Sequence, residues 1–330
     1  MSLKILQSGL LSTIQDNGRF GFQKYGVIKS GAMDLYAHRL ANILAGNPDD
    51  EATLEMTLLG PSIEFTEDTI IALTGGNLSP KVNGQPIPLW RPVFVRSGAK
   101  LEFGAPVSGC RTYMAASGGY DLEPELGSRS TYLKARIGGV NGRALTENDE
   151  LNIRESDLIG KAAIRNSEAK AIPASWYMKP DYNVVNKTVR YIEGREYEWF
   201  TEDSQSVFNT EEFTLTSQSD RMGYRIEGPV LALKEKRELL SEAVGFGTIQ
   251  VPAGGQPIIL MADHQTTGGY PKMGQVIAVD LPHLAQLKPG EKIKFEKTTI
   301  EEAQKLFVQR EKGIDFIRNM VRDKFEKGVL

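Results

Sequence analysis

The chain has few of the cysteine and histidine residues that disulfide bonds and structural metal sites require. It contains one cysteine, Cys110, and three histidines among 330 residues. A single cysteine cannot form an intramolecular disulfide, and no two of His38, His264 and His283 have the spacing of metal ligands. We therefore expect no structural zinc site and assign no metal ligand, while a hard cation held by carboxylates stays open. Cys110 is interpreted as a small buried hydrophobic residue, and the core is expected to form by hydrophobic burial alone.

Long apolar runs and blocks of like charge are also missing. The longest apolar run, residues 258–262, is far shorter than the roughly 20 residues that cross a membrane. The N-terminal residues lack the apolar stretch of a signal peptide. Lys and Arg number 39 against 42 Asp and Glu, which gives a net charge of −3 without a basic stripe. We therefore expect a cytoplasmic protein that binds neither membrane nor nucleic acid.

The apolar residues that are present occur in short, mostly β-branched segments. Glycine (33) and proline (16) separate these segments. This pattern predicts a mainly β protein with a few helices, built as a sandwich or barrel rather than from βαβ units. The expected strands include residues 63–65, 69–73, 93–95, 100–103, 189–192, 213–216, 248–251, 257–261, 275–279 and 292–295.

Helical periodicity is confined to a few places. Apolar residues keep 3.6-residue spacing over residues 33–45 before a Gly-Asn-Pro stop, and His38 lies inside this segment as a structural residue. A second helix is expected over residues 299–327, where Thr299 and Glu302 fit a capping box. Gly313 is expected to interrupt this second helix.

An internal repeat indicates a duplicated β-domain. Four pairs of segments match in the same order, offset by 187 to 202 residues: Arg19-Phe20-Gly21-Phe22 with Arg221-Met222-Gly223-Tyr224, Leu54-Glu55 with Ser241-Glu242, residues 70–73 with 258–261, and residues 98–103 with 290–295. We therefore expect a first domain over residues 1–170, with an inserted helix near 33–45. The second domain covers residues 171–330 and carries the C-terminal helix. The linker is placed within residues 162–183.

One polar loop stands between two expected strands, residues 257–261 and 275–279. Its candidate functional residues are Asp263, His264, Gln265, Thr266, Tyr270 and Lys272. A carboxylate could accept an amide N–H, an imidazole could exchange a proton near neutral pH, and an ammonium could stabilise an oxyanion or a phosphate. The alternative is a hairpin connection whose polar groups satisfy one another and water.

Two related turns, each with an arginine and a glycine, are candidate anion sites. Arg19 and Arg221 could each clamp a carboxylate, and Ser30 precedes a glycine where backbone N–H groups could face an anion. The alternative for the first turn is loop chemistry plus a helix N-cap. A third polar stretch contains Arg129, which could line a cleft or face a partner chain, although an ordinary surface loop fits it better.

Taken together, these motifs resemble a known family. The sequences Gln15-Asp16-x-Gly18-Arg19-x-Gly21, Ser30-Gly31-Ala32-Met33-Asp34, Ser128-Arg129-Ser130-Thr131, Ser219-Asp220-Arg221-Met222-Gly223-Tyr224 and the loop from Ala262 to Lys272 look like the family of 5-oxoprolinase C subunits. This family is also called the Kip-antagonist or allophanate-hydrolase subunit 2 family. The resemblance implies two cyclophilin-like β-barrels. It also implies a complex with two further 5-oxoprolinase subunits, a Kip-inhibitor-like B subunit and an A subunit.

The resemblance also implies an activity, the ATP-dependent conversion of 5-oxo-L-proline to L-glutamate. On this basis Asp263 and His264 would orient or deprotonate the amide N–H of the substrate. Lys272, with Arg221 or Arg19, would balance phosphate or carboxylate charge. ATP would then be a co-substrate, bound by this chain or together with the partner subunit.

Two other functions remain open on the same resemblance. Some relatives are regulatory proteins that counteract an inhibitor of the sporulation histidine kinase. Related domains of urea carboxylase transfer a carboxyl group from biotin to urea. No lysine here lies in a Met-Lys-Met context, so biotin would have to arrive on another chain.

Overall fold

The chain forms two compact units, each built from segments that are not continuous in sequence. The computed structural model describes residues 1–158, 168–178, 187–235 and 237–328. The first unit comprises Met1–Gly18, Asp34–Val184 and Lys312–Leu330, and the second comprises Arg19–Met33 and Val185–Glu311. The domain boundary that the sequence analysis places at residue 170 stays a prediction. Residues 162–167 and 179–183 of the expected linker lie outside the described residues.

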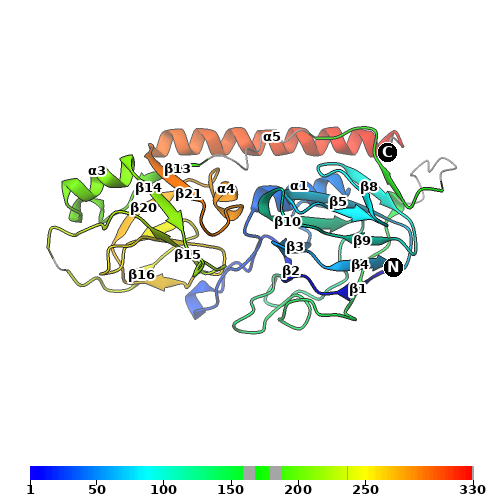
Figure 1. The fold of residues 1–330 in the computed structure, drawn as a ribbon, viewed down its shortest axis with the longest axis horizontal. Coiled ribbons are helices and arrows are strands. Elements are labelled where there is room, and N and C mark those ends of the chain that lie inside the picture. The colour runs from blue at the N-terminus through cyan, green and yellow to red at the C-terminus, as the bar shows by residue number, and fades with distance from the viewer. Residues whose placement is uncertain (159–167, 179–186, 236, 329–330) are drawn as a thin grey trace. The chain divides into compact units, whose positions relative to one another are not determined.

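The first unit consists of two six-stranded sheets (Figure 1). One sheet has the order β11 (Glu150–Asn152), β1 (Ser2–Gln7), β4 (Ser62–Phe65), β9 (Lys100–Glu102), β6 (Lys81–Val82) and β7 (Gln85–Pro86). The other has the order β12 (Ala171–Pro173), β8 (Pro92–Val95), β5 (Thr69–Asn77), β10 (Ser108–Ala116), β3 (Thr53–Thr57) and β2 (Leu11–Gln15). The middle of the expected linker is therefore a strand, β12, paired with β8.

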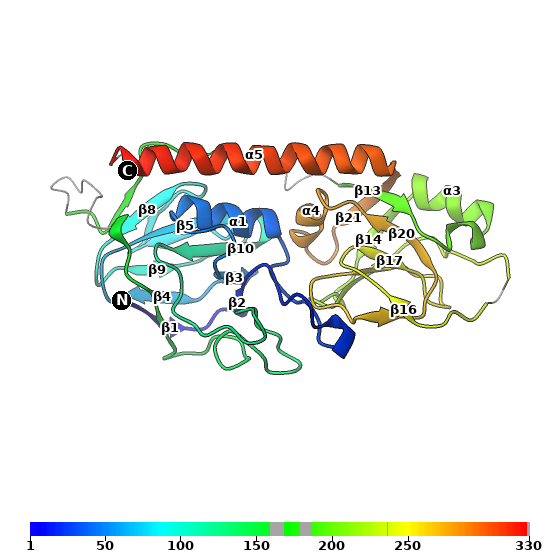
Figure 2. The same cartoon turned by 180° about the vertical axis from the view of Figure 1, so that it is seen from behind.

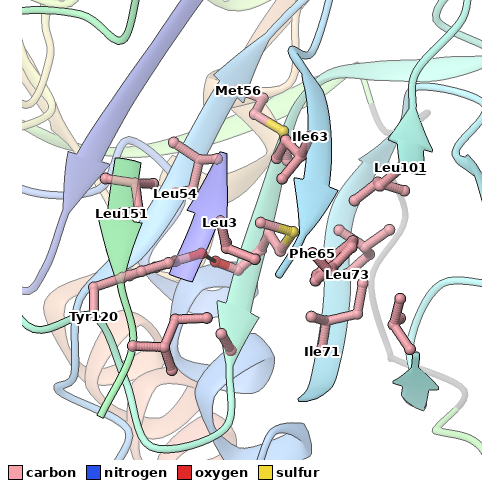
Figure 3. Close-up of a cluster of buried hydrophobic side chains, with 14 of the residues drawn as sticks. Leu3, Leu54, Met56, Ile63, Phe65, Ile71, Leu73, Leu101, Tyr120 and Leu151 are labelled. Carbon is pink, nitrogen blue, oxygen red and sulfur yellow. Dashed lines mark hydrogen bonds between the residues drawn. The ribbon is translucent and has the colours of Figure 1, made fainter. Parts of the chain in front are cut away.

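The core of the first unit lies between these two sheets. Leu3, Phe65 and Leu101 from one sheet meet Leu54 and Leu73 from the other, as Figure 3 shows. All five side chains are fully buried. The strands β1 and β4 of the first sheet alternate buried and partly exposed residues, whereas β5 and β10 are buried almost throughout. This difference arises because β5 and β10 also carry a helix on their other face.

That helix, α1 (Leu35–Leu44), is the helix expected near residues 33–45. It packs against β3, β5 and β10 (Figure 2). Asp34 is its N-cap and accepts the backbone N–H of Ala37 at 2.9 Å, so the cap lies four residues beyond Ser30. His38 is fully buried, and its Nδ1 lies 2.8 Å from Thr53 Oγ1. The structural role expected for His38 agrees with this position.

The second unit closes into a barrel of seven strands. Their order is β13 (Thr188–Glu193), β20 (Lys272–Val276), β17 (Thr248–Gln250), β18 (Ile258–Leu260), β15 (Gly223–Glu227), β14 (Glu212–Leu215) and β21 (Lys292–Lys297). A parallel pairing of β13 with β21 completes the closure. A separate two-stranded ribbon joins β16 (Glu242–Ala243) to β19 (Thr267–Gly268).

Aromatic side chains fill the barrel, and short helices accompany it. Phe208 stacks on Phe295 with ring centroids 4.3 Å apart, and Tyr191 meets Phe208 edge to face at 5.0 Å. Phe208 belongs to α3 (Glu202–Thr210), which packs against β21. The remaining short helices are α4 (Leu281–Ala285), η1 (Gln23–Tyr25) and η2 (Tyr197–Trp199). The predicted fold class, mainly β with a few helices and a barrel-type duplication, is confirmed.

The long C-terminal helix differs from expectation in one respect. α5 (Ile300–Glu326) covers the predicted residues but runs through Gly313 without a break. The Thr299 hydroxyl accepts the backbone N–H of Glu302 at 3.2 Å, as expected for an N-cap. The interruption was wrong because one glycine costs only about 1 kcal/mol. The burial of Ile314 and Val321, which both follow Gly313 in the helix, contributes more than this. Within the described chain, no helix combines the length and apolarity that a membrane span requires.

Gly313 gives a direct test of this ordering of energies. A Cβ built at this exposed helical position meets no atom within 4 Å. We therefore expect Gly313→Ala to raise the free energy of unfolding by about 0.5–1 kcal/mol, measured by urea denaturation. Gly142→Ala is the matched control. Its φ is +65° and its Cβ would lie 2.0 Å from the Arg136 backbone, so it should destabilise the protein. A destabilised Gly313→Ala protein would contradict this account.

Burial makes His38 a source of acid sensitivity. Desolvation lowers its pKa to about 4, even though Asp16, Glu55 and Asp49 oppose the shift. In the unfolded chain this histidine has a pKa near 6.5, so it binds a proton as the pH falls toward 5, whereas the buried His38 of the folded chain stays neutral. Proton binding therefore favours the unfolded state. From pH 7.5 to pH 5 this should remove about 2 kcal/mol of stability. The loss should be absent from the His38→Gln protein in urea titrations at both pH values. Equal pH slopes for the two proteins would refute it.

Candidate functional site

The polar loop that follows β18 is anchored by a buried ion pair in the second unit. Arg221 Nε donates to Asp263 Oδ2 at 2.9 Å, and Arg221 Nη2 donates to Asp263 Oδ1 at 3.0 Å. Both side chains are more than nine-tenths buried. The register of β15 and β18 brings the two residues together. Gly223 pairs with Leu260 in the antiparallel ladder, and beyond it the backbone N–H of Asp263 donates to the carbonyl of Arg221 at 2.7 Å. The loop thus lies beside the Arg221 turn.

Ser30 joins this ion pair from the segment Arg19–Met33. Its hydroxyl donates to Asp263 Oδ1 at 2.7 Å, and Arg221 Nη2 also donates to the carbonyl of Gly31 at 2.6 Å. Ser30 has a φ of +55° and Gly31 a φ of +100°, a left-handed kink that turns both groups toward the pair. Both carboxylate oxygens of Asp263 are therefore engaged by protein groups.

His264 is held as a neutral imidazole with a defined tautomer. It is 8% exposed, and its Nδ1 lies 2.6 Å from the carbonyl oxygen of Gln265. A carbonyl only accepts, so Nδ1 carries the proton and Nε2 is the basic nitrogen. Burial lowers the pKa of His264, and the positive charge of Lys29 lowers it further, while the Gln265 bond and Asp263 act in the opposite direction. The geometry provides a proton acceptor at Nε2.

Lys272 lies in an ion-pair cluster at the start of β20. Its Nζ is 3.5 Å from Glu196 Oε2 and also contacts Glu242 Oε1. The hydrogen bond from Lys272 lowers the pKa of Glu242. Glu242 pairs with Gly268 in the β16–β19 ribbon, so the cluster ties the far side of the loop to the barrel. The charge of Lys272 is thus balanced by two carboxylates, and its expected catalytic role stays a prediction.

The other candidate residues divide between exposed and buried positions. Gln265 and Tyr270 are exposed and Thr266 is partly exposed, so all three lie at the surface of the loop. Arg19 is fully buried in the second unit, and its backbone N–H donates to the carbonyl of Lys29 at 2.7 Å. Their roles in binding stay predictions.

Arg129 belongs to the first unit and supports a buried carboxylate. Its backbone N–H donates to Asp16 Oδ2 at 2.6 Å, and the hydroxyls of Ser128 and Ser130 donate to Asp16 Oδ1 at 2.7 and 2.5 Å. Burial raises the pKa of Asp16, but these bonds outweigh it and bring the pKa below its usual value. The guanidinium of Arg129 lies 3.4 Å from Glu51. The structure thus gives Arg129 a structural position in a different unit from the polar loop.

Sequence reasoning missed the acidic partners of the loop. Glu196 and Glu242 lie 76 and 30 residues from Lys272, and only Glu242 carried a signal, as part of a repeated segment. Among the described residues, no group of three or more His, Cys, Asp or Glu side chains could hold a metal ion.

Comparison with known proteins gives this geometry a context. The family model for the carboxyltransferase domain, subdomain A and B, matches residues 25–297. The 5-oxoprolinase C subunit of Haemophilus influenzae is 39% identical over 98% of this chain and 99% of its own. The Escherichia coli 5-oxoprolinase C subunit is 40% identical over 92% of this chain and 93% of its own.

A solved structure agrees with the sequence relatives. The Kluyveromyces lactis urea carboxylase superposes with a TM-score of 0.86 at 29% identity, over 96% of this chain and 29% of that protein. The match therefore covers part of a larger protein, whereas the two bacterial relatives match over nearly their full length. The chain belongs to the family of 5-oxoprolinase C subunits and carries its carboxyltransferase domain, subdomains A and B.

Proposed function

We propose that this chain is the C subunit of an ATP-dependent 5-oxoprolinase that converts 5-oxo-L-proline to L-glutamate. The observation that carries the proposal is the identity of 39–40% to two bacterial C subunits over nearly the full length of each chain. The name of those relatives, a C subunit, implies further subunits. We propose that these are an A subunit and a Kip-inhibitor-like B subunit.

The chemical problem is the stability of a five-membered lactam. ATP transfers its γ-phosphoryl group to the amide oxygen, which makes the carbon a better electrophile. Water then adds to that carbon, and the ring C–N bond breaks, which frees the amine and leaves an acyl phosphate. A second water hydrolyses the acyl phosphate to glutamate and phosphate. We propose that His264 Nε2 accepts the proton lost by the water or the amide. Its lowered pKa supports this role because it keeps the imidazole neutral at physiological pH.

In this proposal Asp263 orients His264 and the loop rather than attacking the substrate. Its two oxygens are bound by Arg221 and Ser30, so a lactam N–H would have to displace the Ser30 hydroxyl to reach it. The charge of Lys272 is already shared between Glu196 and Glu242. Phosphate or carboxylate charge would therefore be balanced mainly by groups that the partner subunits supply, and the part predicted for Arg19 stays a prediction.

Carboxyl transfer is the second candidate. The carboxyltransferase family model and the superposition on urea carboxylase favour it. This reaction predicts dependence on a biotinylated carrier protein, because the chain has no biotinylation sequence of its own. ATP-driven lactam opening does not need such a carrier.

Reconstitution with each of the three subunits omitted in turn tests the proposed function. We expect phosphate release from ATP to require 5-oxoproline, this chain and both partners, and to yield one glutamate per phosphate. Addition of a biotinylated carrier should change nothing. If turnover persists without this chain, or appears only with urea and the carrier, the proposal fails.

The Arg221–Asp263 pair gives a sharper test of the site. Asp263→Asn should lower the free energy of unfolding by about 3–5 kcal/mol, because it leaves a buried guanidinium without its counter-charge. The double variant Asp263→Asn with Arg221→Met removes both charges and should recover much of that stability. Both variants should lack 5-oxoproline-dependent ATP turnover, measured after gel filtration confirms binding to the partner subunits. Full turnover by the restabilised double variant would show that the pair is purely structural.

A further inference from the structure

A concave site lies in the first unit, at the end of β5. This cavity, called the β5 cavity here, has a volume of about 590 Å³ and opens to solvent. Gly75, Asn77, Ser79, Lys81, Leu89 and Trp90 are among its lining residues, all on β5, on β6 or in the segments that flank the β6–β7 hairpin. Its size falls within the roughly 300–1,000 Å³ typical of small-molecule sites.

Strained backbone concentrates around this cavity. Trp90 has a φ of +61° and Ser79 a φ of +52°, conformations that cost side-chain-bearing residues of order 1–3 kcal/mol each. Trp90 is held there by two backbone bonds, from its own N–H to Leu73 O at 2.8 Å and from Met178 N to its carbonyl at 2.9 Å. Gly75, with a φ of +84°, is a third left-handed residue in the same wall. Strain of this kind persists where a site requires a particular shape.

The lining has the chemistry of a site for an anion that accepts hydrogen bonds. It contains one ammonium, from Lys81, and no carboxylate. Asn77 Oδ1 accepts the backbone N–H of Ser79 at 2.8 Å, which fixes the amide plane. Within the described part of the chain, Asn77 Nδ2 makes no hydrogen bond, so its two protons are available as donors. Proline and leucine side chains and the Trp90 ring supply an apolar wall for a small ring.

The internal repeat places this cavity at the counterpart of the polar loop. Residues 70–73 match residues 258–261 with an offset of 188, so Gly75 corresponds to Asp263 and Asn77 to Gln265. One copy of the duplicated domain thus has a loop of mutually satisfied charges after this strand, and the other copy has an open cavity. The end of β18 in the second unit is occupied by the charged groups of the polar loop, whereas the matching end of β5 in the first unit is open to a ligand.

We propose that the β5 cavity is a binding site for a small cyclic amide that carries a carboxylate, separate from the polar loop at which the proposed function places the reacting lactam. The carboxylate lies at Lys81 and the amide oxygen at Asn77 Nδ2. The ring lies against the wall formed by Leu89 and Trp90. The choice of 5-oxo-L-proline as this ligand rests on the proposed function, whereas the charge and donor pattern comes from the cavity itself.

Calorimetric titration of the purified full-length chain with 5-oxo-L-proline and with 2-pyrrolidinone tests the assignment. 2-Pyrrolidinone has the same ring without the carboxylate. We expect the chain to bind 5-oxoproline about tenfold more tightly, the size of one charge-assisted hydrogen bond near solvent. Lys81→Met should remove this preference by weakening 5-oxoproline about tenfold while leaving 2-pyrrolidinone unchanged. Lys81→Arg should retain the preference.

Asn77→Asp is the matched probe of the amide contact. It keeps the oxygen that accepts Ser79 N–H but replaces the donor by a negative charge, so it should weaken both ligands and 5-oxoproline more. Lys100→Met, on the neighbouring strand β9 and outside the cavity, is the control and should bind like the unaltered chain. Circular dichroism of each variant checks that these surface changes leave the fold intact.

The outcomes separate this proposal from the proposed function. Absence of 5-oxoproline binding to the unaltered chain overturns the cavity assignment, as does binding that Lys81→Met and Asn77→Asp leave unchanged. Binding that Asp263→Asn removes and Lys81→Met leaves unchanged would place the ligand at the polar loop alone and would also overturn the cavity assignment. If the reconstituted complex lacks 5-oxoproline-dependent ATP turnover but binding still depends on Lys81, the cavity assignment stands and the proposed function fails.

Discussion

The buried pair of Arg221 and Asp263 is the interaction on which the polar loop depends. Two charges removed from water are stable only when every donor and acceptor around them is matched, and here the hydroxyl of Ser30 and the carbonyl of Gly31 complete the set. The pair therefore fixes three segments at once: the turn before β15, the loop after β18 and the kink at residues 30–31. His264 directly follows Asp263, so the pair also fixes the backbone that carries the imidazole. The bond from Nδ1 to the Gln265 carbonyl then makes Nε2 the basic nitrogen.

Because the charges of Arg221 and Lys272 are already balanced by carboxylates, they attract an anionic ligand only weakly. A guanidinium and an ammonium that already face carboxylates offer little net charge to an incoming anion, and a displaced carboxylate would be left buried and unpaired. Arg221 and Lys272 are therefore better suited to shaping the loop than to binding phosphate or carboxylate. Recognition of an anion therefore requires groups whose charge is not already balanced by a buried partner.

Sequence reasoning succeeded where the signal is local and failed where it depends on tertiary register. The spacing of apolar residues located α1 and α5, and β-branched segments located most strands. α3 was missed because its nine residues contain only two large apolar side chains, Val207 and Phe208. β20 begins at Lys272, three residues before the expected strand, because that end pairs with β17 across a bulge. The polar loop was recognisable from composition, but Ser30 lies 233 residues from Asp263, a contact that only the folded barrel creates.

Duplication gives the two units a common form but not a common chemistry. After matched strands, one copy places an ion pair that needs nothing further, and the other keeps a cavity whose walls include residues in costly left-handed conformations. Evolution removes such strain readily, since a glycine at Ser79 or Trp90 would relieve it. The strained backbone is retained at the end of β5, whereas the end of β18 carries a matched ion pair. The two copies of the domain thus differ in what they offer a ligand. The second unit contributes a polar loop fixed by its ion pair, and the first unit contributes a cavity whose lining includes hydrogen-bond donors available to a ligand.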